Sequence, residues 1–303
     1  MKNILNQALN KVTIVGKLLD VTFGSGTTKT GVPYERATVN IRVTQTYGGR
    51  EETSEIPVGM FSTQYTSKGA INPAWKSIQA LKEMKTAQNV GFDAADTVAF
   101  RGSGAANLRE NNFVSKSGQL VNSWQLSGSF INTTTASDAA TFNIDIFIMD
   151  MHPETTRDGD PTGRLVIKGG IVQYNGELDV VEFIVEGPDQ VEYIERNWEE
   201  NTTVNVQGRV RITTVEDKHS GHSGSWGEEV PEDTTRIVRE LIITTGDDVP
   251  KDEEFSYDPV DIKKAFAVRK AKIEQLQIDA KNTKAAAPAS ASAASTSSKY
   301  SWE

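Results

Sequence analysis

Few side chains in this sequence could perform catalysis, and they are scattered. The 303-residue chain has no cysteine and three histidines, at positions 152, 219 and 222. His219 and His222 lie in a Gly/Ser-rich segment with no third metal ligand in view, and Asp158-Gly159-Asp160 lacks the distal glutamate of a calcium loop. No nucleotide-binding glycine loop or serine elbow is present. We therefore expect no catalytic residue, no cofactor, no metal site and no enzyme.

Cationic and aromatic side chains, by contrast, recur together in the first half of the chain. Alternating apolar residues from Ile56 to Met60 form the inward side of a predicted strand, so Phe61 falls on its outer face. The outward positions of the preceding predicted strand include Arg36 and Arg42. Aromatic rings for bases, with cations for the backbone, are how proteins hold single-stranded nucleic acid without reading its sequence. The alternative is that the arginines are merely solvated and Phe61 packs under the next helix.

Other residues extend this pattern into neighbouring segments. Tyr47 lies in a hairpin turn at the rim of the predicted face, and Phe113 lies in a predicted loop between the last two strands. Each of these rings could instead anchor its own hairpin. Trp124 is two residues before Leu126 and falls on the same side of the predicted strand, so we expect it in the core. The predicted nucleic-acid contacts are Lys11, Lys17, Tyr34, Arg36, Asn40, Arg42, Tyr47, Phe61, Arg109, Phe113 and Lys116.

Five predicted strands and one helix must position these residues. The strands span about 11–18, 36–43, 56–60, 97–102 and 121–132, and a helical period over 72–85 separates the third strand from the fourth. Glycines at 48 and 49 favour a hairpin turn between the second and third strands. Three strands, a helix and two further strands is the order of the OB-fold, a five-stranded Greek-key barrel.

The same order occurs a second time after a small polar linker at 133–140. Predicted strands at about 142–151, 164–174, 178–186, 203–213 and 235–245 surround a short helix at 188–198. Thr97–Gly102 aligns with Thr203–Gly208, and Tyr47 corresponds to Tyr174. The predicted class is therefore all-β: two tandem five-stranded OB-fold barrels with a C-terminal helix and a disordered tail. We assign the first barrel to 1–135, the second to 140–248, the helix to 258–282 and the Ala/Ser-rich tail to 283–303.

The net charge of −9 is distributed unevenly along the chain. Residues 1–132 carry 14 Lys and Arg against 9 Asp and Glu, a net +5, whereas residues 133–303 carry 18 against 32, a net −14. A positive first half is compatible with a polyanionic ligand, because phosphate binding depends on clustered Lys and Arg. The second predicted barrel turns Glu182 and Glu186 outward, which favours dimerisation or partner docking there over strand binding.

Three segments of the first half resemble the single-stranded DNA-binding (SSB) proteins of bacteria and phages. Asn10–Lys17 is similar to their opening strand, Glu52–Phe61 to their third strand, and Phe113–Gln119 to a hairpin that begins with a stacking aromatic residue. The resemblance implies a non-enzymatic protein that binds single-stranded DNA in replication, recombination or repair and is encoded by a phage.

Within that resemblance, Phe61, Phe113 and Tyr47 occupy the positions of base-stacking aromatics. The sequence departs from the family at the stacking tryptophan of the third strand, which is replaced by Glu55 or Ile56, and in a longer helical segment. The resemblance therefore implies base stacking with one ring fewer than in the family.

The C-terminal region also has the layout of an SSB protein, in which a disordered spacer and a short acidic, aromatic tip recruit replication and repair enzymes. Residues 285–298 contain only Ala, Ser, Thr and Pro, and the chain closes with Tyr300, Trp302 and Glu303. The resemblance implies that these three residues bind replication or recombination proteins. The tip lacks the family's run of Asp and terminal Phe, so the alternative is a tail that only solvates. Asp247-Asp248-Val249-Pro250 is a second acidic candidate, which could instead cap the barrel.

No run approaches the roughly 18 apolar residues of a membrane-spanning helix, and the N-terminus lacks the apolar core of a signal peptide. We expect a cytoplasmic protein, in the host cytoplasm if phage-encoded, with no membrane partner. The sequence leaves open whether the protein forms a homo-oligomer. Two alternative functions also stay open. One is a β-rich structural or assembly protein without a nucleic-acid ligand, and the other is a recombination annealing protein that uses the same face.

Overall fold

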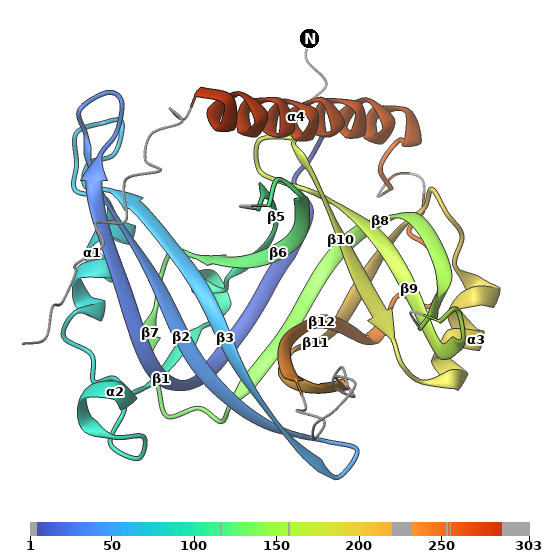
Figure 1. Cartoon of the computed structure of the whole chain (residues 1–303), viewed down its shortest axis with the longest axis horizontal. Helices are drawn as coiled ribbons and strands as arrows, with labels where there is room; N and C mark the ends of the chain where they lie inside the picture. Colours follow the sequence, from blue (N-terminus) through green and yellow to red (C-terminus); the bar gives the residue numbers. More distant parts are fainter. Residues whose placement is uncertain are drawn as a thin grey trace, which may run out of the picture.

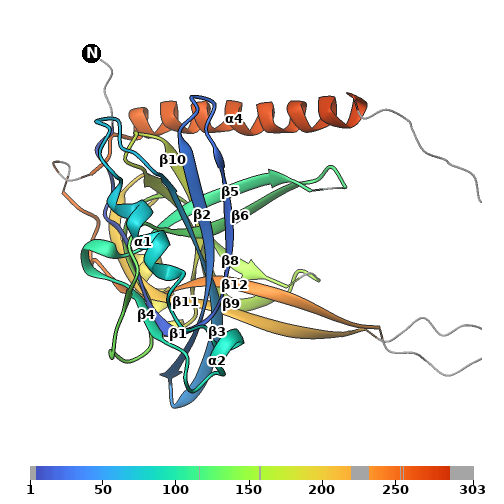
Figure 2. The same cartoon turned by 90° about the vertical axis from the view of Figure 1, so that its left-hand side faces the viewer.

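The computed structural model of the chain describes residues 5–115, 117–156, 158–219, 232–252, 254 and 256–286. It is built mainly from β-strands, with one long helix, α4 (Pro259–Ala286), lying across the barrels (Figures 1 and 2). None of the helices in this part of the chain is long and apolar enough to cross a membrane. The predicted all-β class with a C-terminal helix is confirmed, and the predicted tail from residue 287 onwards lies outside the described residues.

The first barrel consists of β1 (Asn10–Thr27), β2 (Pro33–Tyr47), β3 (Arg50–Thr63), β5 (Asn107–Val114) and β6 (Leu120–Gly128). The first three strands form an antiparallel meander, β3 runs parallel to β6, and β6 pairs with β5. A bridge between Val12 and Ala106 closes the ring. The connection from β3 to β5 contains α1 (Pro73–Leu81), α2 (Ala87–Val90), β4 (Thr97–Phe100) and a 3-10 turn at Gly102–Gly104, and β4 pairs with the short β7 (Asn132–Thr133).

The second barrel repeats this plan with β8 (Ala139–Thr155), β9 (Pro161–Val172), β10 (Leu178–Val185), β11 (Thr203–His219) and β12 (Glu232–Gly246). Helix α3 (Pro188–Asn197) separates its third and fourth strands. The parallel contact between β10 and β12 places Ile184 opposite Ile242, and β11 closes the barrel by pairing with both β12 and β8. The predicted tandem repeat of two five-stranded barrels is confirmed.

The two barrels share one sheet because β1 changes partner along one of its edges. Its residues 10–15 pair with β8, and from Lys17 onwards the same edge pairs with β2, while β4 occupies the opposite edge. Gly16 lies at the change of partner, where an added Cβ would overlap the carbonyl oxygen of Arg42. The sequence meets this constraint with a glycine, which allows β2 to approach β1 closely.

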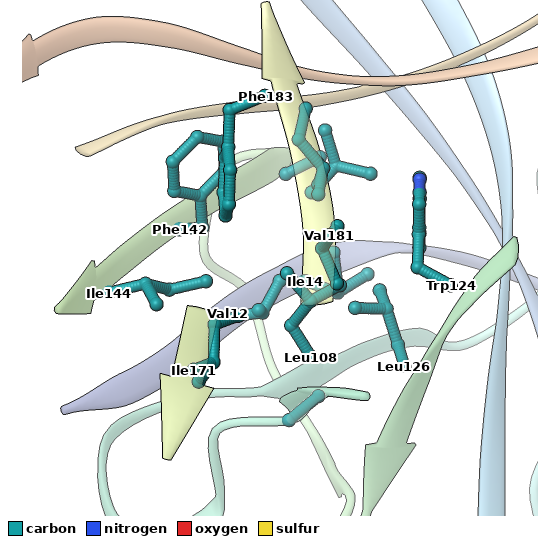
Figure 3. Close-up of a cluster of buried hydrophobic side chains, with 14 of the residues drawn as sticks. Val12, Ile14, Leu108, Trp124, Leu126, Phe142, Ile144, Ile171, Val181 and Phe183 are labelled. Atoms are coloured by element: carbon teal, nitrogen blue, oxygen red, sulfur yellow. The ribbon is translucent and has the colours of Figure 1, made fainter. Parts of the chain in front are cut away.

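One continuous hydrophobic core follows from this shared sheet. Side chains of β1, β5 and β6 meet those of β8, β9 and β10, as Figure 3 shows for Ile14, Leu126, Val181 and Phe183. All four are 4% exposed or less, and Trp124 is also buried, as its parity predicts. The barrels are therefore packed as a single unit.

Replacing Gly16 by Ala should lower the free energy of unfolding by about 1–3 kcal/mol, because the new methyl group forces β2 away from β1. Gly59→Ala is the matched control, since a Cβ there lies 3.6 Å from the nearest neighbouring atom, an ordinary contact. Urea unfolding of both variants measures the difference. Equal stabilities would contradict a steric constraint at Gly16.

A reciprocal pair of hairpins also joins the barrels. In the first barrel Glu52, five residues after Tyr47, forms an ion pair with Arg209 on β11 of the second. In the second barrel Asp179, five residues after Tyr174, forms an ion pair of 2.8 Å with Arg109 on β5 of the first. Each barrel thus reaches with its second hairpin to the fourth strand of the other barrel, an arrangement that follows from the sequence repeat.

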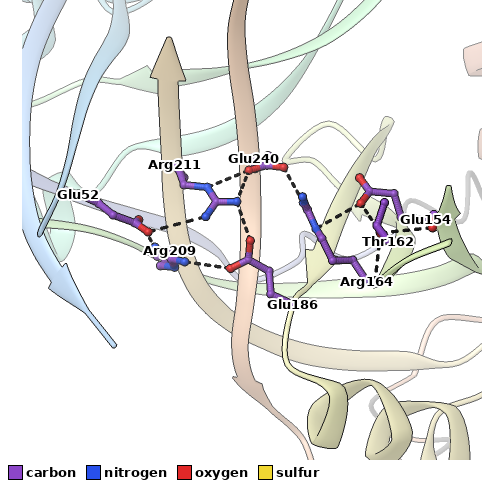
Figure 4. Close-up of polar contacts among 8 residues, drawn as sticks. All are labelled: Glu52, Glu154, Thr162, Arg164, Glu186, Arg209, Arg211 and Glu240. Carbon is purple, nitrogen blue, oxygen red and sulfur yellow. Dashed lines mark hydrogen bonds and ion pairs between the residues drawn. The ribbon is translucent and has the colours of Figure 1, made fainter. Parts of the chain in front are cut away.

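The contact at Glu52 belongs to a larger ion-pair network (Figure 4). Glu186 and Glu240 both approach Arg211, at 2.6 and 2.5 Å, and Glu240 also pairs with Arg164 at 2.5 Å. Burial by itself would raise the pKa of the Glu240 carboxyl, but the hydrogen bonds and charges of Arg164 and Arg211 hold this pKa below its ordinary value.

This lowered pKa predicts a pH dependence of stability. An unfolded glutamate titrates near pH 4.3, so the ionised Glu240 stabilises the fold above about that pH. The contribution is lost as the pH falls through the lower folded-state pKa. Glu240→Gln should therefore reduce the loss of stability between pH 6 and pH 3, measured by urea unfolding. Glu195→Gln, at an exposed position of α3, should leave this loss unchanged. Parallel pH profiles for all three proteins would contradict this role.

Several predicted boundaries are wrong. The predicted loop that contains Phe113 is strand β5, so the fourth strand of the barrel is broken into β4 and β5 around the turn at residues 102–104. The polar residues Glu110-Asn111-Asn112 of β5 have low β-propensity, but their pairing with β6 outweighs this local preference. The first strand continues to Thr27 and the second begins at Pro33, because these two strands go on pairing with each other beyond the barrel. The helix predicted over 72–85 ends at Leu81.

Helix α4 begins after Asp258, whose side chain accepts a hydrogen bond from the Val260 amide at 2.8 Å. It extends four residues past its expected end at 282, since it reaches Ala286. Arg269 pairs with Glu110 of the first barrel and Lys272 with Glu177 of the second. The helix therefore ties both barrels together from one side.

Candidate nucleic-acid interface

The outward side chains of β1, β2 and β3 form a surface that we call the outer face. On β2 the core positions are Ala37, Val39, Ile41 and Val43, so Tyr34, Arg36, Asn40 and Arg42 point outward. In the register of β2 with β3, Arg36 lies opposite Phe61, and Arg42 lies opposite Glu55. The structure thus brings four predicted contacts on β2 together with Phe61.

Phe61 is the most exposed ring of this face, with 59% of its surface accessible. Tyr34 lies beside it, with ring centroids 5.3 Å apart and planes tilted by 37°. The neighbouring Arg36 is exposed and has no carboxylate partner among the residues that the structure describes. Two rings and one uncompensated cation therefore lie within one short stretch of the sheet.

Two glycines on β1 leave room for the side chains of Tyr34 and Arg36. Gly26 pairs with Tyr34 and Gly24 with Arg36. An added Cβ at Gly26 would be 2.7 Å from the Tyr34 hydroxyl oxygen, and one at Gly24 would be 2.6 Å from Arg36 Nε. Both side chains on β2 therefore lie across the glycines of β1.

The other end of the outer face is more polar. Arg42 forms an ion pair of 2.6 Å with Glu55, in which both side chains are at least 38% exposed. Its guanidinium also lies 5.0 Å from the ring centre of Phe92, an exposed residue after α2. Such an exposed pair contributes about 0–1 kcal/mol, so Glu55 holds Arg42 only weakly. Asn40 donates a hydrogen bond to Asp20 at 2.8 Å.

Phe113 lies on a separate arm. The β5–β6 hairpin extends away from the barrel, on the same side of the molecule as the free end of α4 (Figure 2). Phe113 pairs with Val121 on this arm and is 44% exposed. Lys116, predicted beside it, lies outside the described residues.

Four other predicted contacts lie away from the outer face or have protein partners. Lys17 donates to the carbonyl oxygens of Ala95 and Asp93 at 2.8 and 3.3 Å. Tyr47 lies against Arg209 at 4.3 Å, and burial raises the pKa of its hydroxyl. Arg109 pairs with Asp179, and Lys11 is exposed on the part of β1 that pairs with β8. Their roles as nucleic-acid contacts stay predictions.

Phe23 provides a useful contrast to Phe61. It is 42% exposed, but it pairs with the inward-facing Ala37 and its ring lies 5.7 Å from Lys82 Nζ, after α1. Phe23 therefore lies on the side of the sheet that faces the helix. Sequence parity alone could not reveal this position, because the long pairing of β1 with β2 was not predicted.

Two features of the outer face were missed by the sequence reasoning. Phe92 lies in a segment without strand periodicity, and only the fold brings it to Arg42. The Gly24-Ser25-Gly26 segment carries a period-2 signal, but its meaning depends on the register that sets it opposite Arg36 and Tyr34.

The corresponding surface of the second barrel has a different character. Glu182 is exposed on β10 and pairs across the sheet with Lys168. Arg209 and Arg211 are already bound by Glu186 and by Glu52 from the first barrel. The hairpin of the first barrel thus occupies cations that would otherwise be available to a ligand.

Known proteins include a family that matches this sequence and structures with a similar fold. The model of the YorF family matches residues 8–279. No curated protein matches the sequence. The crystal structure of the wild-type single-stranded DNA binding protein from Thermus aquaticus superposes with a TM-score of 0.51 at 10% identity, covering 80% of this chain and 93% of that chain. A deletion mutant of that protein has a TM-score of 0.49 at 12% identity, covering 82% and 98%. At this identity the likeness to the wild-type protein is one of fold.

Proposed function

This chain belongs to the YorF family, and we propose that it binds single-stranded DNA without sequence preference through the outer face of its first barrel. Bases would stack on Phe61 and Tyr34, while Arg36 and Arg42 would contact the backbone. The biological setting that we propose is replication, recombination or repair in a phage-infected cell. We propose no catalytic step.

The observation that carries this proposal is the pair formed by Tyr34 and Phe61 beside Arg36. Removing a large apolar side chain from water lowers the free energy. A ring that stays 59% exposed beside a cation is therefore better explained by a ligand than by packing within the chain. Stacking on aromatic faces is tolerant of sequence because every base has such a face. The chemistry of the site therefore supports a single strand rather than a duplex.

Charge supports the same assignment. The first 132 residues have a net charge of +5, against −14 for the remainder. Association with a polyanion is favoured on the positive half, where Phe61 and Tyr34 also lie. The second barrel is proposed as an auxiliary unit, and its acidic character favours proteins over DNA. A partner role for Tyr300, Trp302 and Glu303 stays a prediction, because these residues lie outside the described part.

Direct binding is the first test. A titration with fluorescein-labelled oligo-dT should show binding whose affinity falls with salt, at a log-log slope of about −0.7 for each phosphate neutralised. A duplex of equal length should bind more weakly, because its bases are not free to stack. Absence of binding at low salt would overturn the proposal and favour a structural or assembly role.

Two aromatic substitutions test the site itself. Phe61→Ala and Tyr34→Ala should each weaken oligo-dT binding by about 1–3 kcal/mol through loss of stacking. Phe23→Ala removes a ring of similar exposure from the other side of the sheet and should leave the affinity unchanged. An equal loss in all three variants, or none in the first two, would contradict this placement of the strand.

A further inference from the structure

A pocket of about 320 Å³ lies in the second barrel between α3 and the end of β12. Its floor is apolar and consists of Val185, Ile194, Trp198 and Ile243, each at most 5% exposed. Tyr193 forms part of the wall and is 45% exposed. Figure 1 places α3 on the opposite side of the molecule from β1, β2 and β3, so this pocket is separate from the outer face.

Hydrogen bonds between the two walls of the pocket fix its shape. Trp198 Nε1 donates to the Asp247 carbonyl oxygen at 2.9 Å, and the Tyr193 hydroxyl donates to that of Asp248 at 3.2 Å. Gln190 Nε2 donates to the Thr244 carbonyl oxygen at 3.3 Å. These three bonds connect α3 to the end of β12 and the residues after it. The pocket is therefore preformed and would not have to be ordered at the moment of binding.

The rim of the pocket is acidic. Asp189 in the first turn of α3 and Asp248 after β12 both line the pocket, whereas the Asp247 carboxylate accepts a hydrogen bond from the Asn205 amide at 2.7 Å. Carboxylates repel phosphate, so this chemistry excludes a nucleic acid as the ligand. A cation next to an apolar side chain would match both the rim and the floor.

We propose that this pocket docks a short segment of a partner protein in which a large apolar residue is flanked by Lys or Arg. The apolar side chain would cover Trp198 and Ile243, and the flanking cations would lie against Asp189 and Asp248. Complementary charge favours such a segment over a second copy of this chain, whose net charge is −9. The proposal assigns Asp248 a binding role, whereas Asp247 is bonded to Asn205 at the end of the barrel, and it does not depend on DNA binding.

The test uses the full-length protein and a fluorescein-labelled decapeptide with a central Trp flanked on both sides by Lys. Fluorescence anisotropy should show saturable binding, weakened at least about tenfold by Asp189→Lys, with the oligo-dT affinity unchanged. Glu195→Lys is the matched control, because it makes the same charge change on the exposed side of the same helix and should leave the affinity within about twofold.

Two further measurements keep the result specific. A peptide with Ala in place of Trp should lose at least about tenfold in affinity, because the apolar floor stays uncovered. Equal binding of both peptides, or equal weakening by Asp189→Lys and Glu195→Lys, would overturn the proposal in favour of general charge attraction. Sedimentation that shows a dimer dissociated by Asp189→Lys would also overturn it, since the occupant would then be a second copy.

Discussion

The pairing of β1 with two strands along a single edge is the constraint on which the rest of the structure depends. At Gly16 the edge passes from β8 of the second barrel to β2 of the first, and only a residue without a Cβ allows the close approach of Arg42. This exchange makes the two barrels one sheet with one core. It also fixes the first barrel so that its meander of β1, β2 and β3 remains open to solvent on the outer side.

The same packing separates two surfaces of opposite chemistry. The outer face carries Phe61, Tyr34 and Arg36, whereas the pocket beside α3 has an apolar floor and an acidic rim. The ion pairs at Glu52 and Asp179 and the shared core join the barrels, so these surfaces lie on one packed unit. If both proposals hold, a single strand and a partner segment would occupy separate surfaces and would not compete.

The sequence predicted the parts of this structure that follow from local alternation. The strand order, the repeat, the outward position of Phe61 and the buried Trp124 all depend on period-2 patterns. What was missed depends on pairing between distant segments. Strand β5 is formed from a polar run that only β6 stabilises, and Tyr47 lies against Arg209 because the second barrel is there to receive it. Neither contact leaves a signal within its own segment.

Photo-cross-linking tests the central claim, that a single strand lies on the outer face of the first barrel. Oligo-dT that contains single 5-iodo-deoxyuridine residues would be irradiated in the complex, and the linked peptides identified by mass spectrometry. The account predicts cross-links to the β2 and β3 peptides that contain Tyr34 and Phe61. Cross-links confined to the second barrel, with none in β2 or β3, would contradict it.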